Sequence, residues 1–300
     1  MDDFTNKKTA VALGNFDGLH KGHIAVINEA VIRRSNGLLP CIVTFETHPQ
    51  KILTGLAPEA LMTQSVFETR AEKLGCRIVK LNFQQVMNMS PREFFDEILV
   101  KKLGAGFVSC GFNYRFGKKG SGNAELLAQY CKSSGIGFSC VSGVEFEGES
   151  ISSTRIRTAI RNGETEKANA MLGDCFSYDF EVMCGDRIGN VKLGFPTINQ
   201  IFPDDFIVPA SGVYASKTEI DSIVYPSMTN IGKRPTVNGN QLRSETHIIG
   251  FTGDLYGKNP KVSLLSRMRD EIKFPSLEAL SEQLKKDCKN AELIYNEGSL

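Results

Sequence analysis

The 300-residue chain lacks features that would mark several classes of protein. No apolar run approaches the length of a membrane span, and residues 1–8 hold no apolar stretch of the secretory kind, so we expect a cytoplasmic protein without a membrane partner. The net charge is only +1 and no basic block occurs, which argues against a nucleic-acid partner. The eight cysteines form no Cys-x-x-Cys pair, so we expect reduced, mostly buried thiols and no zinc site.

Histidine is also scarce, and two of the four histidines, His20 and His23, follow an apolar β-type run and a glycine-rich turn. The turn has neither the Walker A pattern nor the spacing of a dinucleotide fingerprint. A strand, a tight turn and a helix start can present backbone N–H groups to a phosphate. Gly14 and Gly18 allow close backbone approach, and Gly22 leaves room between His20 and His23. The His-x-Gly-His pattern resembles the nucleotidyltransferase signature; the alternative is an ordinary turn with two surface histidines.

Up to about residue 172, strand-like runs alternate with helical segments, which predicts an α/β domain with a doubly wound parallel (Rossmann-like) sheet. Ligands of such sheets bind beyond the carboxyl ends of the strands. The helix predicted over 90–103 begins with a capping box formed by Ser90 and Glu93. The expected strands are Thr9–Leu13, Cys41–Phe45, Arg77–Leu81, Gly106–Cys110 and Gly137–Val141.

From Phe176 onward, short β-type runs are separated by turn residues, which predicts a small antiparallel barrel or sandwich. A final helix from Ser276 carries an apolar stripe that is expected to dock on this barrel. The stripe consists of Leu277, Leu280, Leu284 and Cys288. We therefore predict two domains, 1–178 and 179–300.

Two further segments of the first half can carry chemistry. The loop 111–122 mixes aromatic, cationic and glycine residues, so it can stack on a planar ring while Arg115 and the lysines meet phosphate. Its alternative is a solvated loop. The segment 151–157 opens a helix with hydroxyl residues, which cap the helix or bind phosphate together with Arg157.

Taken in order, the motifs resemble those of the bacterial bifunctional riboflavin kinase/FMN adenylyltransferase (FAD synthetase) family over nearly the whole chain. The motifs of the first half are Gly14–His23, Val43–Pro49, Cys110–Lys118 and Ile151–Arg157. Those of the second half are Leu193–Asn199, Gly212–Tyr214, Thr229–Thr236, Glu245–Ile248, Asp254–Gly257 and Arg269–Phe274.

The resemblance implies that the first half joins FMN to ATP, giving FAD and pyrophosphate. His20 and His23 would contact the ATP phosphates in the transition state, and Phe112, Asn113 and Arg115 would face the flavin. The implied ATP-binding residues are Gly14, Asn15, Phe16, Gly22, Ser152, Thr154 and Arg157.

For the second half, the resemblance implies a riboflavin kinase β-barrel that transfers the ATP γ-phosphate to the 5′-hydroxyl of riboflavin. Glu245 would be the general base, although its spacing alone indicates an ordinary strand carboxylate. Thr197 and Asn199 would serve Mg²⁺, and Arg269 would bind the flavin. The implied ATP-binding residues are Gly189, Lys192 and Gly194.

The kinase half departs from the family pattern at residues 189–194, where the loop is one residue longer and lacks an arginine. We expect this departure to weaken ATP binding rather than to abolish the chemical step. Three alternatives stay open: a monofunctional FMN adenylyltransferase, a flavin-binding regulator or carrier, and transfer to a non-flavin acceptor.

Overall fold

The computed structural model describes residues 8–183, 195–236 and 239–297. It divides into two compact units: Met1–Pro58 with Phe67–Ser152, and Glu59–Val66 with Ser153–Leu300. This division differs from the boundary predicted at 178/179. The reason is that the strand at 177–178 and the helix at 165–172 contact the second sheet, and the helix at 153–161 contacts the helix at 165–172.

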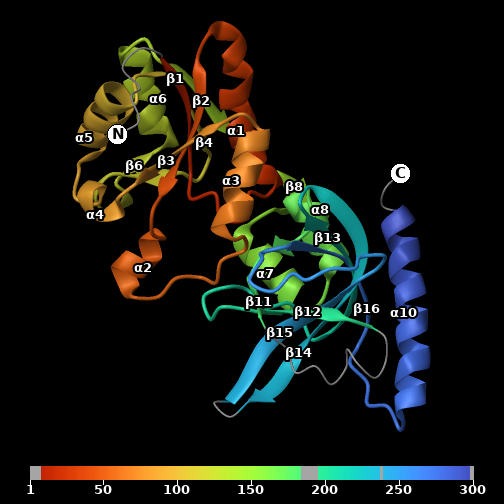
Figure 1. Cartoon of the computed structure of the whole chain (residues 1–300). Coiled ribbons are helices and arrows are strands. Elements are labelled where there is room, and N and C mark those ends of the chain that lie inside the picture. Colours follow the sequence, from red (N-terminus) through yellow and green to blue (C-terminus); the bar gives the residue numbers. More distant parts are fainter. Residues whose placement is uncertain (1–7, 184–194, 237–238, 298–300) are drawn as a thin grey trace. The chain divides into compact units, whose positions relative to one another are not determined.

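The first unit is built on a parallel sheet, as its alternating sequence pattern predicted (Figure 1). Its strands pair in the order β3 (Arg77–Leu81), β2 (Leu39–Phe45), β1 (Thr9–Leu13), β4 (Ala105–Gly111) and β7 (Gly137–Val141). Two short hairpins, β5 (Arg115–Phe116) with β6 (Gly122–Asn123) and β8 (Glu145–Phe146) with β9 (Glu149–Ser150), follow β4 and β7.

Helices cover both faces of this sheet (Figure 1). Helix α1 packs on one face, where Ser109 donates a hydrogen bond from Oγ to the carbonyl oxygen of Val26 at 2.8 Å. Residues 94–103 and helix α6 enclose the main apolar core on the other face. The capping box of Ser90 and Glu93 is present as predicted. The helices are α1 (Lys21–Val31), η1 (Ile32–Asn36), α2 (Pro49–Thr54), α3 (Gln64–Lys73), α4 (Phe83–Val86), α5 (Pro91–Glu93), η2 (Phe94–Lys102), η3 (Lys118–Gly120) and α6 (Ala124–Ser133).

Within its described residues, the second unit is a curled antiparallel sheet, which we call the barrel sheet, together with helices. Its strands pair in the order β10 (Ser177–Tyr178), β16 (Lys261–Arg269), β13 (Gly212–Ile220), β14 (Ile223–Thr236), β15 (Gly239–Ile248), β12 (Thr197–Ile201) and β11 (Val182–Met183). The helices are α7 (Ser153–Arg161), α8 (Thr165–Leu172) and α10 (Leu277–Glu297).

One side of the barrel sheet carries a chain of fully buried hydroxyl groups. Thr229 Oγ1 lies 2.9 Å from Thr246 Oγ1 and 2.8 Å from Ser216 Oγ. The chain continues from Ser216 through Ser227 to Thr218, with 2.9 Å between oxygens at each step. Because each hydroxyl can both donate and accept, these buried polar groups satisfy one another and connect strands β13, β14 and β15.

Helix α10 covers the opposite side of the barrel sheet (Figure 1). Leu284 and Cys288 pack on Val213 and Met228 there, which confirms the predicted docking for these two residues of the stripe. Leu277 does not, since it is 53% exposed in the first turn of the helix. The stripe therefore docks only from the second turn onward.

The segment 59–66 joins the second unit although it lies between β2 and β3 in the sequence. The N–H of Ala60 donates to the carbonyl oxygen of Asp205 at 2.7 Å, and Leu61 is buried. Thr63 Oγ1 donates to Asp179 Oδ1 at 2.5 Å. These contacts explain why Glu59–Val66 clusters with residues that are distant in the sequence.

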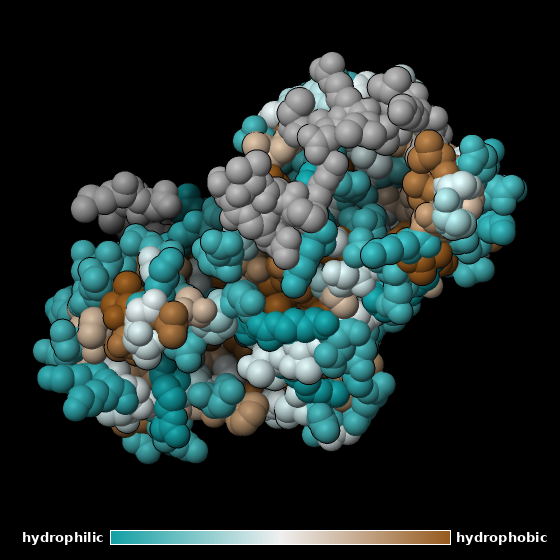
Figure 2. All heavy atoms as spheres, turned by 90° about the horizontal axis from the view of Figure 1, so that it is seen from below, coloured by the Kyte–Doolittle hydropathy of each residue, from teal (hydrophilic) through white to brown (hydrophobic). Residues whose placement is uncertain are grey.

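The outer surface is mainly hydrophilic on the face shown in Figure 2, where apolar atoms form separate patches. None of the described helices combines the length and the apolar content that crossing a membrane requires. The seven described cysteines are all free, but the expectation that most are buried was wrong. Cys41, Cys110 and Cys131 are buried, whereas Cys140 is exposed because it lies on the edge strand β7.

A fragment comparison tests where the second unit begins. We expect residues 153–300 to unfold in one cooperative thermal transition, and residues 179–300 to unfold less cooperatively and at lower temperature. The shorter fragment loses β10, the buried side chains of Phe176 and Tyr178, and the bond from Asn169 Nδ2 to the carbonyl oxygen of Leu264 at 2.9 Å. Equal stability of the two fragments, measured by circular dichroism, would instead support a boundary at 178/179.

Candidate active sites

The strand order of the first unit brings two loops to one edge of its sheet. The chain runs outward from β1 through β2 to β3 on one side, and then continues at β4 on the other side of β1. Strands β1 and β4 are parallel neighbours, so the turn after Leu13 and the loop after Gly111 leave from adjacent carboxyl ends. In open α/β sheets, this change of direction is where ligands bind.

The turn after β1 is held in an unusual backbone conformation. Phe16 and Leu19 have positive φ angles of 54° and 44°, although neither is a glycine. Both side chains are almost completely buried, and burial offsets the cost of this strained backbone. A Cβ atom at Gly14 would lie 3.1 Å from the Phe16 ring, so a glycine there gives the ring its space. Thr44 Oγ1 fixes the turn further by donating to the carbonyl oxygen of Asn15 at 3.0 Å.

His20 and His23 lie at the start of α1. The backbone N–H of His23 donates to His20 Nδ1 at 3.3 Å, so His20 is the N-cap of the helix. The two rings stack with centroids 3.6 Å apart, and the rings of Phe16 and His23 form a T-shaped pair with centroids 5.4 Å apart. Gly22 permits this stack, because a Cβ there would lie 3.1 Å from His20 Cε1. The sequence prediction that Gly22 leaves room beside the histidines is confirmed.

Burial keeps both rings neutral at neutral pH. It lowers the pKa of His20 from 6.5 to about 4. The pKa of His23 also lies well below 6.5, first because of burial and then because of the neighbouring His20. Since His20 Nδ1 accepts a hydrogen bond, the neutral ring carries its proton on Nε2. His23 Nδ1 is buried and has no hydrogen-bond partner within the described part of the chain.

The loop after β4 presents an aromatic ring and polar groups to solvent. Phe112 is 58% exposed, and the side chains of Asn113 and Arg115 are exposed beside it. The Phe112 N–H donates to the carbonyl oxygen of Val141 at 3.0 Å, which anchors the loop to the end of β7. An exposed ring next to a cation is suited to a planar, anionic ligand.

The predicted triphosphate residues of segment 151–157 fall in different units. Ser152 is exposed and is the last residue of the first unit, whereas Thr154 is exposed on α7 of the second. Arg157 is buried, and its Nε donates to the carbonyl oxygen of Glu59 at 2.7 Å. Part of the Arg157 guanidinium therefore holds the segment 59–66, a role that sequence reasoning missed.

In the second unit, strand register brings the predicted kinase residues together. Asn199 on β12 pairs directly with Glu245 on β15, and Glu245 pairs with Asn230 on β14. Directly paired residues point to the same side of a sheet, so these three side chains form one row on the side that α10 covers. Asn199 is buried, and its Oδ1 has no hydrogen-bond partner among the described residues. Thr197 lies two residues from Asn199 on the same side.

An amide oxygen that is buried and unpartnered is suited to a hard cation such as Mg²⁺. Thr197, Asn199 and Glu245 all supply oxygen donors, so the residues present fit such an ion. The described residues contain no group of three or more His, Cys, Asp or Glu side chains that could hold a metal on their own. Gly189, Lys192 and Gly194 lie outside the described residues.

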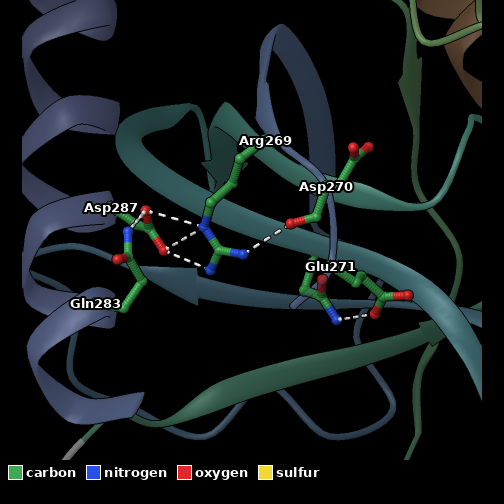
Figure 3. Close-up of polar contacts among 6 residues, drawn as sticks. Arg269, Asp270, Glu271, Gln283 and Asp287 are labelled. Carbon is green, nitrogen blue, oxygen red and sulfur yellow. Dashed lines mark hydrogen bonds and ion pairs between the residues drawn. The ribbon is translucent and has the colours of Figure 1, made fainter. Parts of the chain in front are cut away.

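Arg269 differs from the other predicted flavin residues, because its guanidinium is already engaged (Figure 3). It donates to Asp287 on α10 through Nε at 3.0 Å and through Nη2 at 2.7 Å, both to Oδ2. Gln283 Nε2 donates to the other oxygen of Asp287 at 2.9 Å. The sequence analysis did not identify Asp287 as a partner of Arg269. The signal for it was an acidic residue next to Cys288, which belongs to the predicted apolar stripe.

Comparison with known proteins agrees with both halves. A family model described as FAD synthetase matches residues 3–155, and one described as riboflavin kinase matches residues 172–295. A bifunctional riboflavin kinase/FMN adenylyltransferase of Listeria monocytogenes is 34% identical, with 98% of this chain and 95% of that protein covered. A protein of the same name from Bacillus subtilis is also 34% identical, with 95% and 92% covered.

A solved structure titled as a macrolide-efflux protein of Streptococcus pneumoniae shares the fold, with a TM-score of 0.84 and 32% identity. The similarity covers 96% of this chain and 95% of that one. The chain belongs to the bifunctional riboflavin kinase/FMN adenylyltransferase family. It is a transferase with an adenylyltransferase domain and a kinase domain, and the presence of both favours the bifunctional over the monofunctional reading.

The lowered pKa of His20 predicts how stability changes with pH. The unfolded chain binds a proton on this histidine near pH 6.5, whereas folded His20 resists protonation down to about pH 4. Stability is therefore fully present above pH 6.5 and falls as the pH decreases from 6.5 towards 4. His20→Asn, which keeps a capping side chain, should weaken this dependence in thermal unfolding at pH 7, 6 and 5. His247→Asn in the second unit is the control. An unchanged profile in His20→Asn would contradict a buried, neutral His20.

Proposed function

We propose that this chain makes FAD from riboflavin in two ATP-dependent steps, with the residues of each step on a different unit. The observation that carries the proposal is the pair of separate polar sites: the stacked histidines after β1, and the row of Asn199, Glu245 and Asn230 on the barrel sheet. The cytoplasmic location expected from the sequence is part of the same proposal.

In the adenylyl transfer, a phosphate oxygen of FMN attacks the α-phosphorus of ATP and pyrophosphate leaves. No proton needs to be removed from the attacking phosphate, so the protein mainly positions the groups and stabilises charge. His20 offers Nε2–H as a donor at the N-terminus of α1. A bound triphosphate brings negative charge to these rings, which favours the protonated form of an imidazole and so opposes the effect of burial.

The remaining assignments of this site follow the resemblance. The strained turn at Gly14, Asn15 and Phe16 holds the nucleotide, and exposed Phe112 packs on the flavin with Asn113 and Arg115 beside it. Ser152, Thr154 and Arg157 stay predictions for triphosphate binding.

In the phosphoryl transfer, the 5′-hydroxyl of riboflavin attacks the γ-phosphorus of ATP, giving FMN and ADP. Glu245 accepts the hydroxyl proton, because a neutral hydroxyl is a poor nucleophile. Thr197 and Asn199 would hold Mg²⁺, which would supply positive charge near the transferring phosphate. Binding of the flavin by Arg269 stays a prediction, as do the ATP contacts in residues 189–194.

Replacing His23 tests the adenylyl site. His23→Ala should lower kcat/KM for FAD formation from added FMN by about 100-fold, which is a typical effect of losing one transition-state donor. Riboflavin phosphorylation by the same preparation should stay within about twofold of wild type, because the proposed kinase residues lie in the other unit. FAD formation at the wild-type rate would contradict the assignment of His23.

Replacing Glu245 tests the kinase site. Glu245→Gln keeps the size of the side chain but removes the proton acceptor, so FMN formation from riboflavin should fall by at least about 100-fold. FAD formation from added FMN should be unchanged. A variant that still makes FMN at the wild-type rate would show that Glu245 is not the base.

A further inference from the structure

The segment after β16 connects the C-terminal helix to the predicted kinase row. The row of paired residues extends from Glu245 and Asn230 to Val213 on β13 and then to Arg269 on β16. Arg269 is the last residue of β16, and the chain then passes through Asp270 and Glu271 towards α10. The two ends of this short segment are held by different partners.

Arg269 fixes the start of the segment (Figure 3). Its guanidinium binds the carboxylate of Asp287, and its Nη1 donates to the carbonyl oxygen of Asp270 at 2.8 Å. Asp287 is 2% exposed, and both of its oxygens accept hydrogen bonds from Arg269, with one also bonded to Gln283. A buried carboxylate that is fully paired in this way holds its partner in one geometry.

Glu271 fixes the other end of the segment. Asn230 Nδ2 donates to Glu271 Oε1 at 3.1 Å, and Asn230 is the direct cross-strand partner of Glu245. The carboxylate of Glu271 also lies over Gly232, where a Cβ atom would come so close to Glu271 Oε1 that this carboxylate would have to move. A glycine at 232 therefore leaves Glu271 free to bind Asn230 in this position.

We propose that Asp287 and Glu271 are positioning residues of the kinase site, because Asp287 orients Arg269 and the following residues so that Glu271 holds Asn230 beside Glu245. The C-terminal helix is then part of the kinase site as well as a cover for the barrel sheet. The inference rests on the proposed role of Glu245. It adds a reason why an acidic residue is buried on α10 and why position 232 is a glycine.

Three variants interrupt this chain of contacts at different points. Asp287→Asn weakens the pair with Arg269, Glu271→Ala removes the bond to Asn230, and Gly232→Ala displaces the carboxylate of Glu271. Each should lower kcat for riboflavin phosphorylation by about tenfold or more, because a small misplacement of a reacting group is costly. The KM for ATP should stay within about twofold. Lys286→Ala, an exposed neighbour on α10, is the matched control and should behave as wild type.

The double variant Asp287→Asn/Glu271→Ala separates positioning from a general structural role. If Asp287 acts through Glu271, the double variant should have nearly the same kcat as Glu271→Ala alone. FAD formation from added FMN should be unchanged in every variant, because the proposed adenylyl site lies in the other unit. If Asp287→Asn does not fold, Glu271→Ala and Gly232→Ala still decide the question, because Glu271 is exposed.

The inference would be overturned if Glu271→Ala and Gly232→Ala both phosphorylated riboflavin with the wild-type kcat. It would also be overturned if the double variant lowered kcat by the product of the two single effects. Glu245→Gln is measured in parallel. If it loses FMN formation while Glu271→Ala does not, the positioning role fails and the proposed function stands. If Glu245→Gln keeps FMN formation, Glu245 is not the base, and the inference fails because it rests on that role.

Discussion

The register of the antiparallel strands decides which side chains of the barrel sheet meet. Side chains alternate between the two sides of a strand, so a slip of one residue would move Glu245 away from Asn199 and Asn230. The bond between Thr229 Oγ1 and Thr246 Oγ1 on the opposite side pins β14 against β15 one residue from Glu245. Arg269 and Asp287 pin the last strand to α10. The polar row is thus held from both sides of the sheet.

In the first unit, burial of side chains fixes the geometry of the site, as strand register does in the second unit. Phe16 and Leu19 have positive φ angles in the turn, and the burial of both side chains stabilises it together with the hydrogen bond from Thr44 Oγ1. The same burial lowers the pKa of His20 and His23. A single arrangement therefore sets the position of the two rings and keeps them uncharged at neutral pH.

Much of this organisation could be predicted from the sequence, because it depends on local patterns. The strands Thr9–Leu13, Arg77–Leu81 and Gly137–Val141 have the predicted bounds, since each is a short β-type run with turn residues beside it. The capping box at Ser90 is also local, and so is the space that Gly22 leaves beside His20. These features need no knowledge of distant contacts.

The rest depends on contacts between residues far apart in the chain. No local pattern shows that Glu59–Val66 joins the second unit or that Arg157 binds the Glu59 carbonyl oxygen. The exposure of Leu277 follows from where α10 starts relative to the sheet, and the pairing of Asp287 with Arg269 follows from tertiary packing. The family resemblance implies that Arg269 binds the flavin, whereas in the structure its guanidinium binds the carboxylate of Asp287.

The central claim is that one chain carries both steps from riboflavin to FAD, and its most direct test is a time course with the wild-type protein. Riboflavin, ATP and Mg²⁺ are incubated with the protein, and riboflavin, FMN and FAD are separated by chromatography. The account predicts that FMN rises first and FAD follows, with no FAD when ATP is omitted. If riboflavin is never converted, even at high ATP and Mg²⁺, while added FMN still gives FAD, the claim is contradicted.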